Sequence, residues 1–397
     1  MEKNNKTLNV PNLRFPEFSG EWDNGTLQSV ATLSKGTGIS KDQLSEEGQP
    51  CILYGELYTK YRSEIIDTII SKTDIDPKKL VTSQSNDVII PCSGESAVDI
   101  ATARCVKQSN ILLGGDLNII RLKGEHDGSF FAYQLNGRRK YDIAKVAQGV
   151  SVVHLYGEHL KGVKVNYPSA AEQKKISSLL ALIDQRIETQ KKIIEKYESL
   201  IKGLNNILLY GTEGKYVCLG DILLERSERS RTNNQHEVLS STVKGIFSQR
   251  EYFSKDIASE NNVGYKIIRL HDVVLSPQNL WMGNINYNDR FDIGIVSPSY
   301  KVFSIADGYD NQFVAAMLKT YRALYSYMMV SEQGASIVRR NLNMEAFLQL
   351  VFKIPSLDKQ REIGYAISLL KYQLKTANKI IRAYISQKKY LLRQMFI

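Results

Sequence analysis

The stretch "YPSAAEQKKI" at residues 167–176 returns, little changed, as "IPSLDKQREI" at residues 354–363. When Pro168 is aligned with Pro355, 13 of the 42 positions from 168 to 209 are identical, without a gap. A match of this length at one fixed separation indicates a duplicated structural unit. The chain is therefore expected to contain two related halves.

Both copies begin with signals for the start of a helix. Ser169 can cap the first helix, and Glu172 three residues later completes a capping box. The second copy keeps Ser356 but has Lys359 in place of the glutamate, so only the cap is expected there. A proline directly before each cap keeps the preceding residue extended. Two helices are predicted, one from each copy.

Apolar residues then recur in both copies with alternating steps of four and three residues. This spacing of 3.5 residues is typical of a coiled-coil seam. The first seam comprises Ile176, Leu180, Ile183, Ile187, Gln190, Ile194, Tyr197, Ile201, Leu204 and Leu208. The second comprises Ile363, Ile367, Leu370, Leu374, Ala377, Ile381, Tyr384, Lys388, Leu391 and Met395. Gln190 and Lys388 are polar exceptions that could fix the register.

A seam of this length needs a partner surface. Either each helix packs on its own domain, or the two helices pair with each other. The matched phase favours pairing, and the long intervening chain suits an antiparallel pair with a globular unit at each end. The predicted organisation is globular unit 1–167, helix 168–212, globular unit 213–354 and helix 355–397, an α+β fold with an internal pseudo-twofold repeat.

The resemblance between the halves extends into the globular units. "TLQSVATL" (26–33) matches "CLGDILLE" (218–225), "DVIIPC" (87–92) matches "DVVLSP" (272–277), and "QGVSVVH" (148–154) matches "QGASIVR" (333–339). Each unit reads as short strands followed by one long helix. The predicted strands are 50–58, 87–92, 101–106 and 110–122 in the first unit, and 236–242, 264–276 and 291–305 in the second. The predicted helices are 129–147 and 311–330.

The composition favours a polyanionic partner, because 52 Lys and Arg against 42 Asp and Glu give a net charge of +10. No apolar run reaches the roughly 18–20 residues that span a bilayer, and the N-terminus lacks a signal peptide. A cytoplasmic protein without membrane contact is expected. The four cysteines form no CxxC pair and the five histidines show no ligand spacing, so no metal site is predicted.

Motifs for chemistry are missing from the sequence. There is no Walker A loop, no methyltransferase NPP[FY] tetrapeptide, no three-glycine nucleotide fingerprint and no nuclease-like PD…ExK arrangement. We therefore assign no catalytic residue and no cofactor to this chain. Contact residues for nucleic acid are the remaining candidates.

Three stretches of the first unit carry such candidates. They are a Gly-rich polar loop (34–41), an aromatic and basic stretch (54–62) and a basic run at a helix break (136–140). These stretches combine side chains that can contact bases and phosphates, and Glu56 could accept from a cytosine amino group. A plain surface turn or an ordinary strand is an equally good explanation of the first two. The candidates are Lys35, Thr37, Ser40, Lys41, Tyr54, Glu56, Tyr58, Lys60, Arg62, Arg138, Arg139 and Lys140.

Four stretches of the second unit carry the rest. Gln278 and Asn279 could read adenine, and the tryptophan and methionine after them could pack on bases or sugars. A Pro/Gly loop with one core tryptophan is the alternative. The candidates are Arg226, Arg229, Arg231, Ser240, Ser241, Thr242, Lys244, Gln278, Asn279, Trp281, Met282, Arg339, Arg340 and Asn341. The final helix adds nine Lys and Arg against two acids, which favours an acidic partner or the DNA backbone.

With its repeated helices, their order and the opening "PNLRFPEFSGEW" (11–22), the chain resembles the specificity (S) subunit of a type I restriction-modification enzyme. The resemblance implies two target recognition domains, each reading one half of a bipartite site in double-stranded DNA. It implies that the antiparallel helices set the spacer and dock two modification (methyltransferase) subunits. Two restriction subunits would complete a host-defence complex in a bacterial or archaeal cytoplasm.

The resemblance also implies that this chain is not an enzyme. Methylation with S-adenosylmethionine, and translocation and cleavage with ATP and Mg²⁺, would belong to the partner subunits. An alternative from another class is a coiled-coil scaffold whose two heads bind proteins rather than DNA. A third is a self-contained restriction or methylation enzyme, which methyl transfer by this chain alone would reveal.

Overall fold

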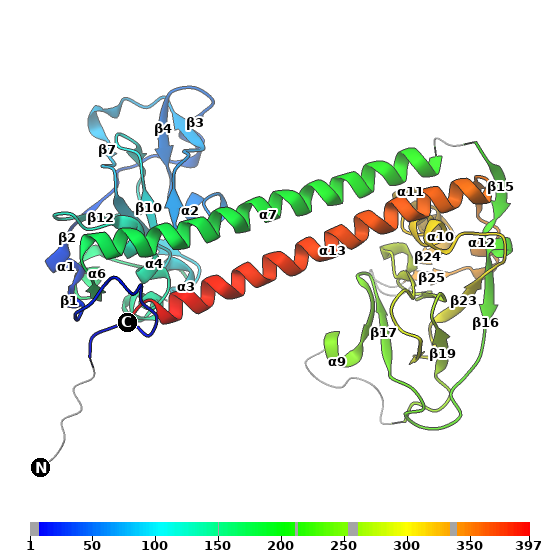
Figure 1. The fold of residues 1–397 in the computed structure, drawn as a ribbon. Helices are drawn as coiled ribbons and strands as arrows, with labels where there is room; N and C mark the ends of the chain where they lie inside the picture. Colours follow the sequence, from blue (N-terminus) through cyan, green and yellow to red (C-terminus); the bar gives the residue numbers. More distant parts are fainter. Residues whose placement is uncertain (1–7, 150, 211–212, 253–260, 334–339) are drawn as a thin grey trace, which may run out of the picture. The chain divides into compact units, whose positions relative to one another are not determined.

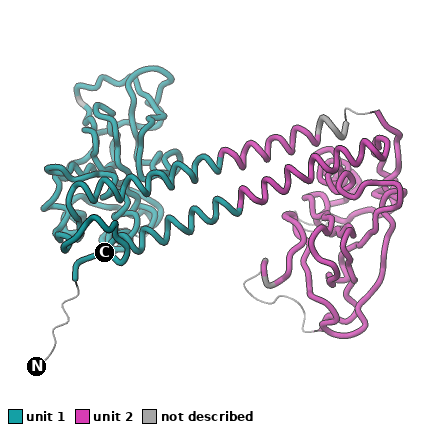
Figure 2. Tube along the Cα trace, in the orientation of Figure 1, with its two compact units in different colours: residues 1–191, 379–397 teal, residues 192–378 magenta. Residues whose placement is uncertain are grey.

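The computed structural model describes residues 8–149, 151–210, 213–252, 261–333 and 340–397. The chain forms two compact units, shown in Figure 2. Unit 1 contains residues 1–191 together with 379–397, and unit 2 contains residues 192–378. Within the described ranges, no helix has both the length and the apolar character needed to cross a membrane. The mixed α+β class predicted from the sequence is confirmed.

Two long helices are shared between the units (Figure 1). Helix α7 (Ala170–Tyr210) and helix α13 (Leu357–Gln394) are each continuous over 41 and 38 residues. They begin one residue after Ser169 and Ser356, as the caps predicted. The Ser169 hydroxyl accepts the Glu172 N–H at 3.4 Å, whereas the Glu172 carboxylate binds Arg14 and Trp22. The predicted reciprocal half of the capping box is therefore replaced by tertiary contacts.

Unit 1 is built on two mixed sheets of five strands each, with the orders β2-β12-β8-β10-β5 and β3-β6-β4-β11-β7. A separate antiparallel pair, β1 with β14, joins the start of the unit to the residues just before α7. The strands are β1 (Asp23–Thr26), β2 (Ala31–Lys35), β3 (Leu44–Ser45), β4 (Gln49–Ile52), β5 (Ile65–Ile66), β6 (Ser71–Thr73), β7 (Val81–Thr82), β8 (Asp87–Pro91), β9 (Ser93–Gly94), β10 (Arg104–Val106), β11 (Leu112–Leu113), β12 (Leu117–Leu122), β13 (Val153–His154) and β14 (Lys164–Tyr167).

The helices of unit 1 cover the first of these sheets. Helix α4 is buried along most of its length, and its Phe130 and Phe131 form a common core with Ile176 and Leu180 of α7. This core fixes the start of α7 to the globular part of unit 1. The shorter helices are α1 (Leu27–Val30), α2 (Glu56–Thr59), α3 (Ala97–Ile100), α4 (Gly128–Asn136), α5 (Lys140–Val146) and α6 (Gly157–Lys161), with 3-10 turns η1 (Lys41–Gln43) and η2 (Pro77–Lys79).

Unit 2 contains one sheet of four strands, in the order β16-β23-β20-β21, and four antiparallel strand pairs. The strands are β15 (Lys215–Cys218), β16 (Leu223–Arg226), β17 (Leu239–Thr242), β18 (Gly245–Ser248), β19 (Lys266–Arg269), β20 (Val273–Leu275), β21 (Ile285–Tyr287), β22 (Ile293–Val296), β23 (Lys301–Ile305), β24 (Ser331–Gln333), β25 (Arg340–Leu342) and β26 (Val351–Ile354). The helices are α8 (Leu219–Ile222), α9 (Gln249–Tyr252), α10 (Asn311–Met317), α11 (Tyr321–Met329) and α12 (Met344–Leu348), with the 3-10 turn η3 (Leu280–Met282).

Two of the matched sequence blocks, 26–33 with 218–225 and 87–92 with 272–277, occupy the same local structures, whereas residues 334–339 of the third block lie outside the described residues. Strand β1 pairs with β14 with Asp23 opposite Tyr167, and β15 pairs with β26 with Lys215 opposite Ile354. Strands β1 and β15 lead directly into the four-residue helices α1 and α8, and these lead into the sheet strands β2 and β16. In the sheets, β12 lies between β2 and β8, and β23 lies between β16 and β20.

One buried glutamine in each copy ties the long helix to its globular part. The Gln173 side chain accepts the Asp127 N–H at 3.0 Å and donates to the Pro168 carbonyl at 2.8 Å. Gln360 accepts the Asp310 N–H at 3.0 Å and donates to the Pro355 carbonyl at 3.0 Å. Asp127 and Asp310 cap α4 and α10, so the same bond joins two helix starts in both units.

Several predicted elements are each two elements in the structure. Predicted helix 129–147 is α4 and α5, with a break at Gly137, and predicted helix 311–330 is α10 and α11, with Thr320 capping the second. The strands predicted at 110–122, 264–276 and 291–305 are each divided by a turn. Predicted strand 50–58 is wrong in its second half, which is helix α2.

Within unit 1, α7 and the end of α13 run antiparallel. Asp184 of α7 is bonded to Lys388 of α13, and the Arg186 guanidinium of α7 lies 5.9 Å from the centre of the Tyr384 ring of α13. Moving forward along α7 therefore means moving backward along α13. The predicted seam residues Ile176, Leu180, Ile183 and Ile187 are buried there with Leu391 and Met395. In unit 1, helix α7 therefore packs both on the globular part of its own unit and on α13. The sequence alone left these two arrangements as alternatives.

The same seam continues through unit 2. Ile363 and Ile367 of α13 belong to the core of that unit, and Ile201 of α7 and Leu374 of α13 line one small cavity. Every predicted seam residue whose side chain is described is buried or half-buried. The side chain of Leu208 lies outside the described residues.

Candidate nucleic-acid interface

The predicted Gly-rich loop at residues 34–41 is held by a close backbone approach and by side-chain hydrogen bonds. A Cβ on Gly36 would lie 2.1 Å from the Gly114 carbonyl oxygen, so only glycine fits this approach. The Thr37 hydroxyl accepts the Val81 N–H at 3.0 Å, and Ser40 bonds to Gln43 at the start of η1. The exposed charges of the loop are Lys35 and Lys41.

Glu56 cannot serve as the predicted cytosine reader, because it points into unit 1. Its carboxylate accepts the Leu53 N–H at 3.0 Å and the Lys60 ammonium at 2.7 Å, and also bonds to the Ser71 hydroxyl. These bonds hold the first turn of α2 against β6. Lys60 is exposed but bonded within the same cluster, and Tyr54, Tyr58 and Arg62 are the other exposed candidates of this stretch.

Two residues not predicted from the sequence join these tyrosines. Burial raises the pKa of Tyr58, and its protonated hydroxyl donates to the Ser93 carbonyl at 2.9 Å. The Ser93 hydroxyl lies 3.3 Å from Nδ1 of His154, whose ring stacks on Tyr156. We call Tyr54, Tyr58, His154 and Tyr156 the aromatic surface of unit 1. His154 ends the repeated block 148–154, which was interpreted only as framework.

Lys35 lies beside the aromatic surface of unit 1. Its ammonium is 3.9 Å from Asp116, and Asp116 accepts from the Ser93 hydroxyl at 3.4 Å. A cation next to half-exposed aromatic rings suits phosphate and base contact together. The structure therefore brings Lys35, from the stretch 34–41, next to Tyr54 and Tyr58, from the stretch 54–62.

The third basic stretch of unit 1 lies elsewhere, in the turn between α4 and α5. Arg139 bonds to Asn166 and to Asp142 at 3.4 Å. Arg138 is exposed and lines a cavity of about 460 Å³ with Arg393 and Phe396 at the end of α13. Lys140 is the first residue of α5 and is half-buried. This stretch remains a candidate for phosphate contact only.

The arginines predicted at 226–231 differ in their availability. Arg226 binds Asp272 at 2.9 Å and Glu228 at 3.1 Å, which occupies its guanidinium inside unit 2. In unit 1 the matched aspartate, Asp87, is also paired with an arginine at 2.8 Å, but that arginine is Arg121 on a different strand, β12. We therefore interpret Arg226 as a structural residue of unit 2. Arg229 and Arg231 are exposed.

The hydroxyl residues at 240–242 hold the β17–β18 hairpin in place. Ser241 is buried, donates to Asn284 at 2.9 Å and accepts from Asn286 at 2.7 Å. Thr242 bonds to the Gly245 carbonyl across the hairpin turn, and Ser240 accepts from Gln249. Lys244, at the tip, is exposed.

Two candidate stretches of unit 2 that are far apart in the sequence meet in the structure. The Arg340 N–H donates to the Gln278 carbonyl at 3.1 Å, and its guanidinium lies over the Trp281 ring at 5.2 Å. Gln278, Met282 and Asn341 are exposed around this contact. We call Gln278, Trp281, Met282, Arg340 and Asn341 the amide surface of unit 2. Arg339 lies outside the described residues.

Asn279 points inward beside the amide surface of unit 2. Its Oδ1 is buried and has no hydrogen-bond partner among the residues that the structure describes. The predicted role of this side chain in reading adenine would need that atom and its amide to turn outward. Among the described residues, no cluster of three His, Cys, Asp or Glu side chains could hold a metal ion.

The fold and these surfaces define a chain with two related α+β units, each fixed to the start of a long helix. The family model of the type I restriction modification DNA specificity domain matches residues 19–199, and this part of the chain belongs to that family. The resemblance predicted from the sequence is confirmed. Specificity subunits of this family are non-catalytic, and methylation and cleavage belong to other subunits of the complex.

Solved structures share the fold over nearly the whole chain. The S subunit of a type I restriction-modification system from M. genitalium is 16% identical, with a TM-score of 0.65, over 98% of this chain and 99% of that chain. A structure from work on complex assembly and conformational transition of the type I R-M system is 11% identical, with a TM-score of 0.52, over 94% and 97%. At these identities the likeness concerns the fold.

Proposed function

We propose that this chain is the DNA-binding specificity subunit of a type I restriction-modification complex in which each unit reads one half of a bipartite, asymmetric site. Residues 1–167 and 213–354 act as the two target recognition domains. The helices 168–212 and 355–397 form an antiparallel coiled coil that sets the spacer between the half-sites. The observation that carries the proposal is the match of residues 19–199 to the DNA specificity domain.

The difference between the two surfaces supports an asymmetric target. The framework of strands, aspartate caps and helix-start glutamines recurs in both units. The aromatic surface of unit 1 is rich in tyrosine and histidine, whereas the amide surface of unit 2 offers Gln278, Asn341 and a stacked arginine. Side-chain amides and arginines discriminate bases in the major groove, and aromatic rings favour stacking. Similar frames with different surfaces suit two different half-sites.

The long helices support the docking of two copies of one partner. Leu182 and Ile193 of α7 are exposed, and so are Leu369 and Ile380, the identical residues at the matched positions of α13. An apolar side chain that stays exposed at the same position in both copies suggests a surface duplicated for binding. We propose two methyltransferase subunits as the occupants. They would supply S-adenosylmethionine and the methyl transfer, and two restriction subunits would supply the ATP- and Mg²⁺-dependent steps in the cytoplasm.

The test is methylome sequencing of a host that lacks other methyltransferases and expresses this chain with its methyltransferase partner. We expect one methylated motif with two specific parts separated by a gap of fixed length. Methylation without a sequence motif would reject sequence reading by this chain. Formation of the complex without any DNA binding at low salt would favour a scaffold whose heads bind proteins.

A further inference from the structure

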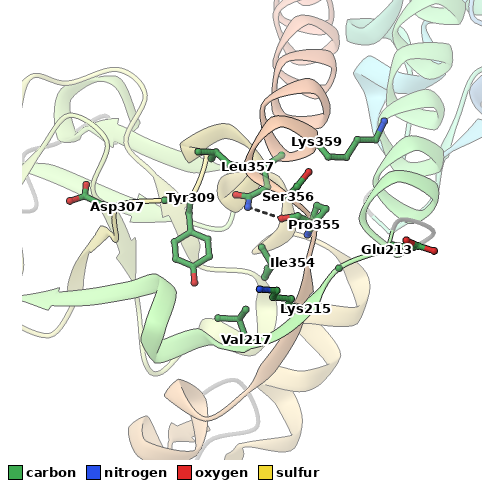
Figure 3. Close-up of a pocket in the computed structure, with 13 residues that line it drawn as sticks. Glu213, Lys215, Val217, Asp307, Tyr309, Ile354, Pro355, Ser356, Leu357 and Lys359 are labelled. Carbon is green, nitrogen blue, oxygen red and sulfur yellow. Dashed lines mark hydrogen bonds between the residues drawn. The ribbon is translucent and has the colours of Figure 1, made fainter.

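A pocket of about 850 Å³ opens in unit 2 at the start of α13. Val217 of β15, Ile354 of β26 and Leu357 of α13 give it apolar walls. Figure 3 shows Tyr309 on one side of the pocket and Pro355 and Lys359, at the start of the helix, on the other. The pocket therefore combines an apolar interior with a cationic side chain at the helix start.

The corresponding place in unit 1 is filled by the protein's own N-terminal segment. Arg14 binds Glu172 on the first turn of α7 at 2.7 Å. Trp22, which immediately precedes β1, is buried in the core of unit 1 and donates its ring N–H to Glu172 at 3.3 Å. An aromatic side chain and an ion pair thus cover the start of α7.

Unit 2 lacks these covering groups at the matched positions. Gly214 precedes β15 where Trp22 precedes β1, and a Cβ there would lie 2.5 Å from the Ile354 carbonyl oxygen. Lys359 stands at the position of Glu172, and its ammonium bonds only to Glu362 of its own helix, at 2.7 Å, among the described residues. Among the described residues, the space filled in unit 1 stays open in unit 2, and the charge at its edge is reversed.

Exposed tyrosines extend the apolar area along α13. Tyr365 is 71% exposed and Tyr372 is 66% exposed, whereas the matched residues of α7 are Ser178 and Gln185. Tyr365 follows Leu357 by eight residues and Tyr372 follows Tyr365 by seven, so both tyrosines lie on the Leu357 side of the helix. Leu369, one of the residues of the proposed methyltransferase surface, is exposed between them. Tyr365, Leu369 and Tyr372 therefore form an exposed surface that begins about two helix turns after Leu357 of the pocket.

We propose that the pocket and the two tyrosines form an extended docking site for one of the two methyltransferase subunits, which inserts an aromatic side chain and places a carboxylate beside Lys359. This proposal rests on the function proposed above. The aromatic group is the chemistry that fills the same place in unit 1, and the carboxylate is the complement of the reversed charge. Glu213 and Asp307 balance Lys215 and Lys359 in the pocket lining, so the pocket lacks the excess positive charge that a polyanion such as DNA requires, whereas a single carboxylate can pair with Lys359.

One consequence is that the two methyltransferase sites are unequal. Only unit 2 has an open pocket at the start of its helix, so one methyltransferase is held more tightly than the other. The test is native mass spectrometry of the full chain titrated with its methyltransferase partner. For the unmodified chain we expect two stepwise dissociation constants that differ by more than the statistical ratio of two equal sites.

The informative variant carries Lys359→Glu, Tyr365→Ser and Tyr372→Gln, which installs the residues of the first copy at the matched positions of α13. We expect one of the two dissociation constants to rise about tenfold or more, because buried aromatic contacts dominate interface energies. Lys164→Glu makes the same charge change on β14, next to the start of α7, and should leave both constants unchanged. The circular dichroism melting of each variant checks that the chain is folded.

The outcomes separate the two proposals. If the triple variant bound two methyltransferases with unaltered constants, the extended site would be rejected and the specificity function retained. If the unmodified chain bound no methyltransferase, both would be rejected. A photo-crosslinking residue at Leu357 should form adducts with an aromatic and acidic segment of the methyltransferase. Adducts only with DNA, with a second copy or within the chain would overturn the proposed occupant.

Discussion

Lys388 shows how one polar residue on an apolar seam joins three elements of unit 1. Its ammonium lies 2.6 Å from Glu64 and 2.6 Å from Asp184, and Asp184 also accepts the Tyr133 hydroxyl at 2.8 Å. Burial raises the pKa of Asp184, and the charge of Glu64 raises it further. Burial opposes the ionisation of Glu64, but Lys388 outweighs it and keeps the pKa of Glu64 below its usual range.

Replacing Lys388 with Met should destabilise unit 1 by about 3–5 kcal/mol near pH 7, because two buried carboxylates lose their cation. Without Lys388, the folded-state pKa of Asp184, which burial and the charge of Glu64 already raise, should rise further above the unfolded value, because Lys388 lowers it. A group with a raised pKa contributes stability at low pH and loses it as pH rises. The deficit of the variant should therefore shrink between pH 7 and pH 5.

The measurement for this variant is urea unfolding followed by tryptophan fluorescence. The chain has two tryptophans, Trp22 in unit 1 and Trp281 in unit 2, so a Trp281→Phe background reports on unit 1 alone. Lys389→Met removes the adjacent, exposed lysine and is the matched control. Equal effects of the two substitutions, or a deficit that does not depend on pH, would contradict the account of Lys388.

The paired glutamines allow a second test at the scale of single residues. Gln173→Leu should leave the Asp127 N–H without its acceptor, and Gln360→Leu should do the same to Asp310. The cost of an unpaired buried donor is about 1–3 kcal/mol. Hydrogen exchange should accelerate around Asp127 in the first variant and around Asp310 in the second. Acceleration in the opposite unit, or in neither, would show that the glutamines do not fix the helix starts.

At the scale of elements, the sequence predicted the long helices well and the globular units only in part. The starts of α7 and α13 follow from Ser169 and Ser356, and the 3.5-residue period marks the residues that are buried. The sequence predicted single long strands where the structure has two short ones, because apolar residues continue on both sides of each turn. Asp116 and His271 turn the chain with positive φ values of 58° and 74°, a conformation that is uncommon for residues other than glycine.

The sequence alone could not show which of the candidate DNA-contact residues are available, because this also depends on tertiary structure. A charged residue is available for DNA only if no partner from elsewhere in the chain occupies it. Glu56 is held by Ser71, fifteen residues away, and Arg226 is held by Asp272, forty-six residues away. Such pairings depend on tertiary structure and leave no local pattern. Arg340 on Trp281 is the favourable case, in which two predicted stretches proved to be neighbours.

A matched lengthening of both helices tests their role as a spacer. One heptad inserted after Lys191 in α7 and one after Asn378 in α13 keep the period of the seam. Seven residues add about 10.5 Å of helix, which corresponds to about three base pairs. The gap in the methylated motif should widen by that amount while both specific parts stay the same. An unchanged gap would reject the spacer, and insertion into α7 alone should disrupt the complex.

At the scale of the whole molecule, we infer that the chain repeats one structural frame twice and varies the side chains that each frame displays. Each unit has its own core, its own sheet and its own buried glutamine at a helix start. Because the units are separately stabilised, a change of surface in one should leave the other intact. This independence is the property that a bipartite reader requires.

The most direct measurement is the methylome of a host in which residues 1–167 are exchanged for the same unit of another specificity subunit. The account predicts that one specific part of the motif changes to that of the donor, while the other part and the gap remain. Exchange of residues 213–354 should give the converse result. If either exchange altered both parts of the motif, or altered neither, the two units would not be independent readers of DNA.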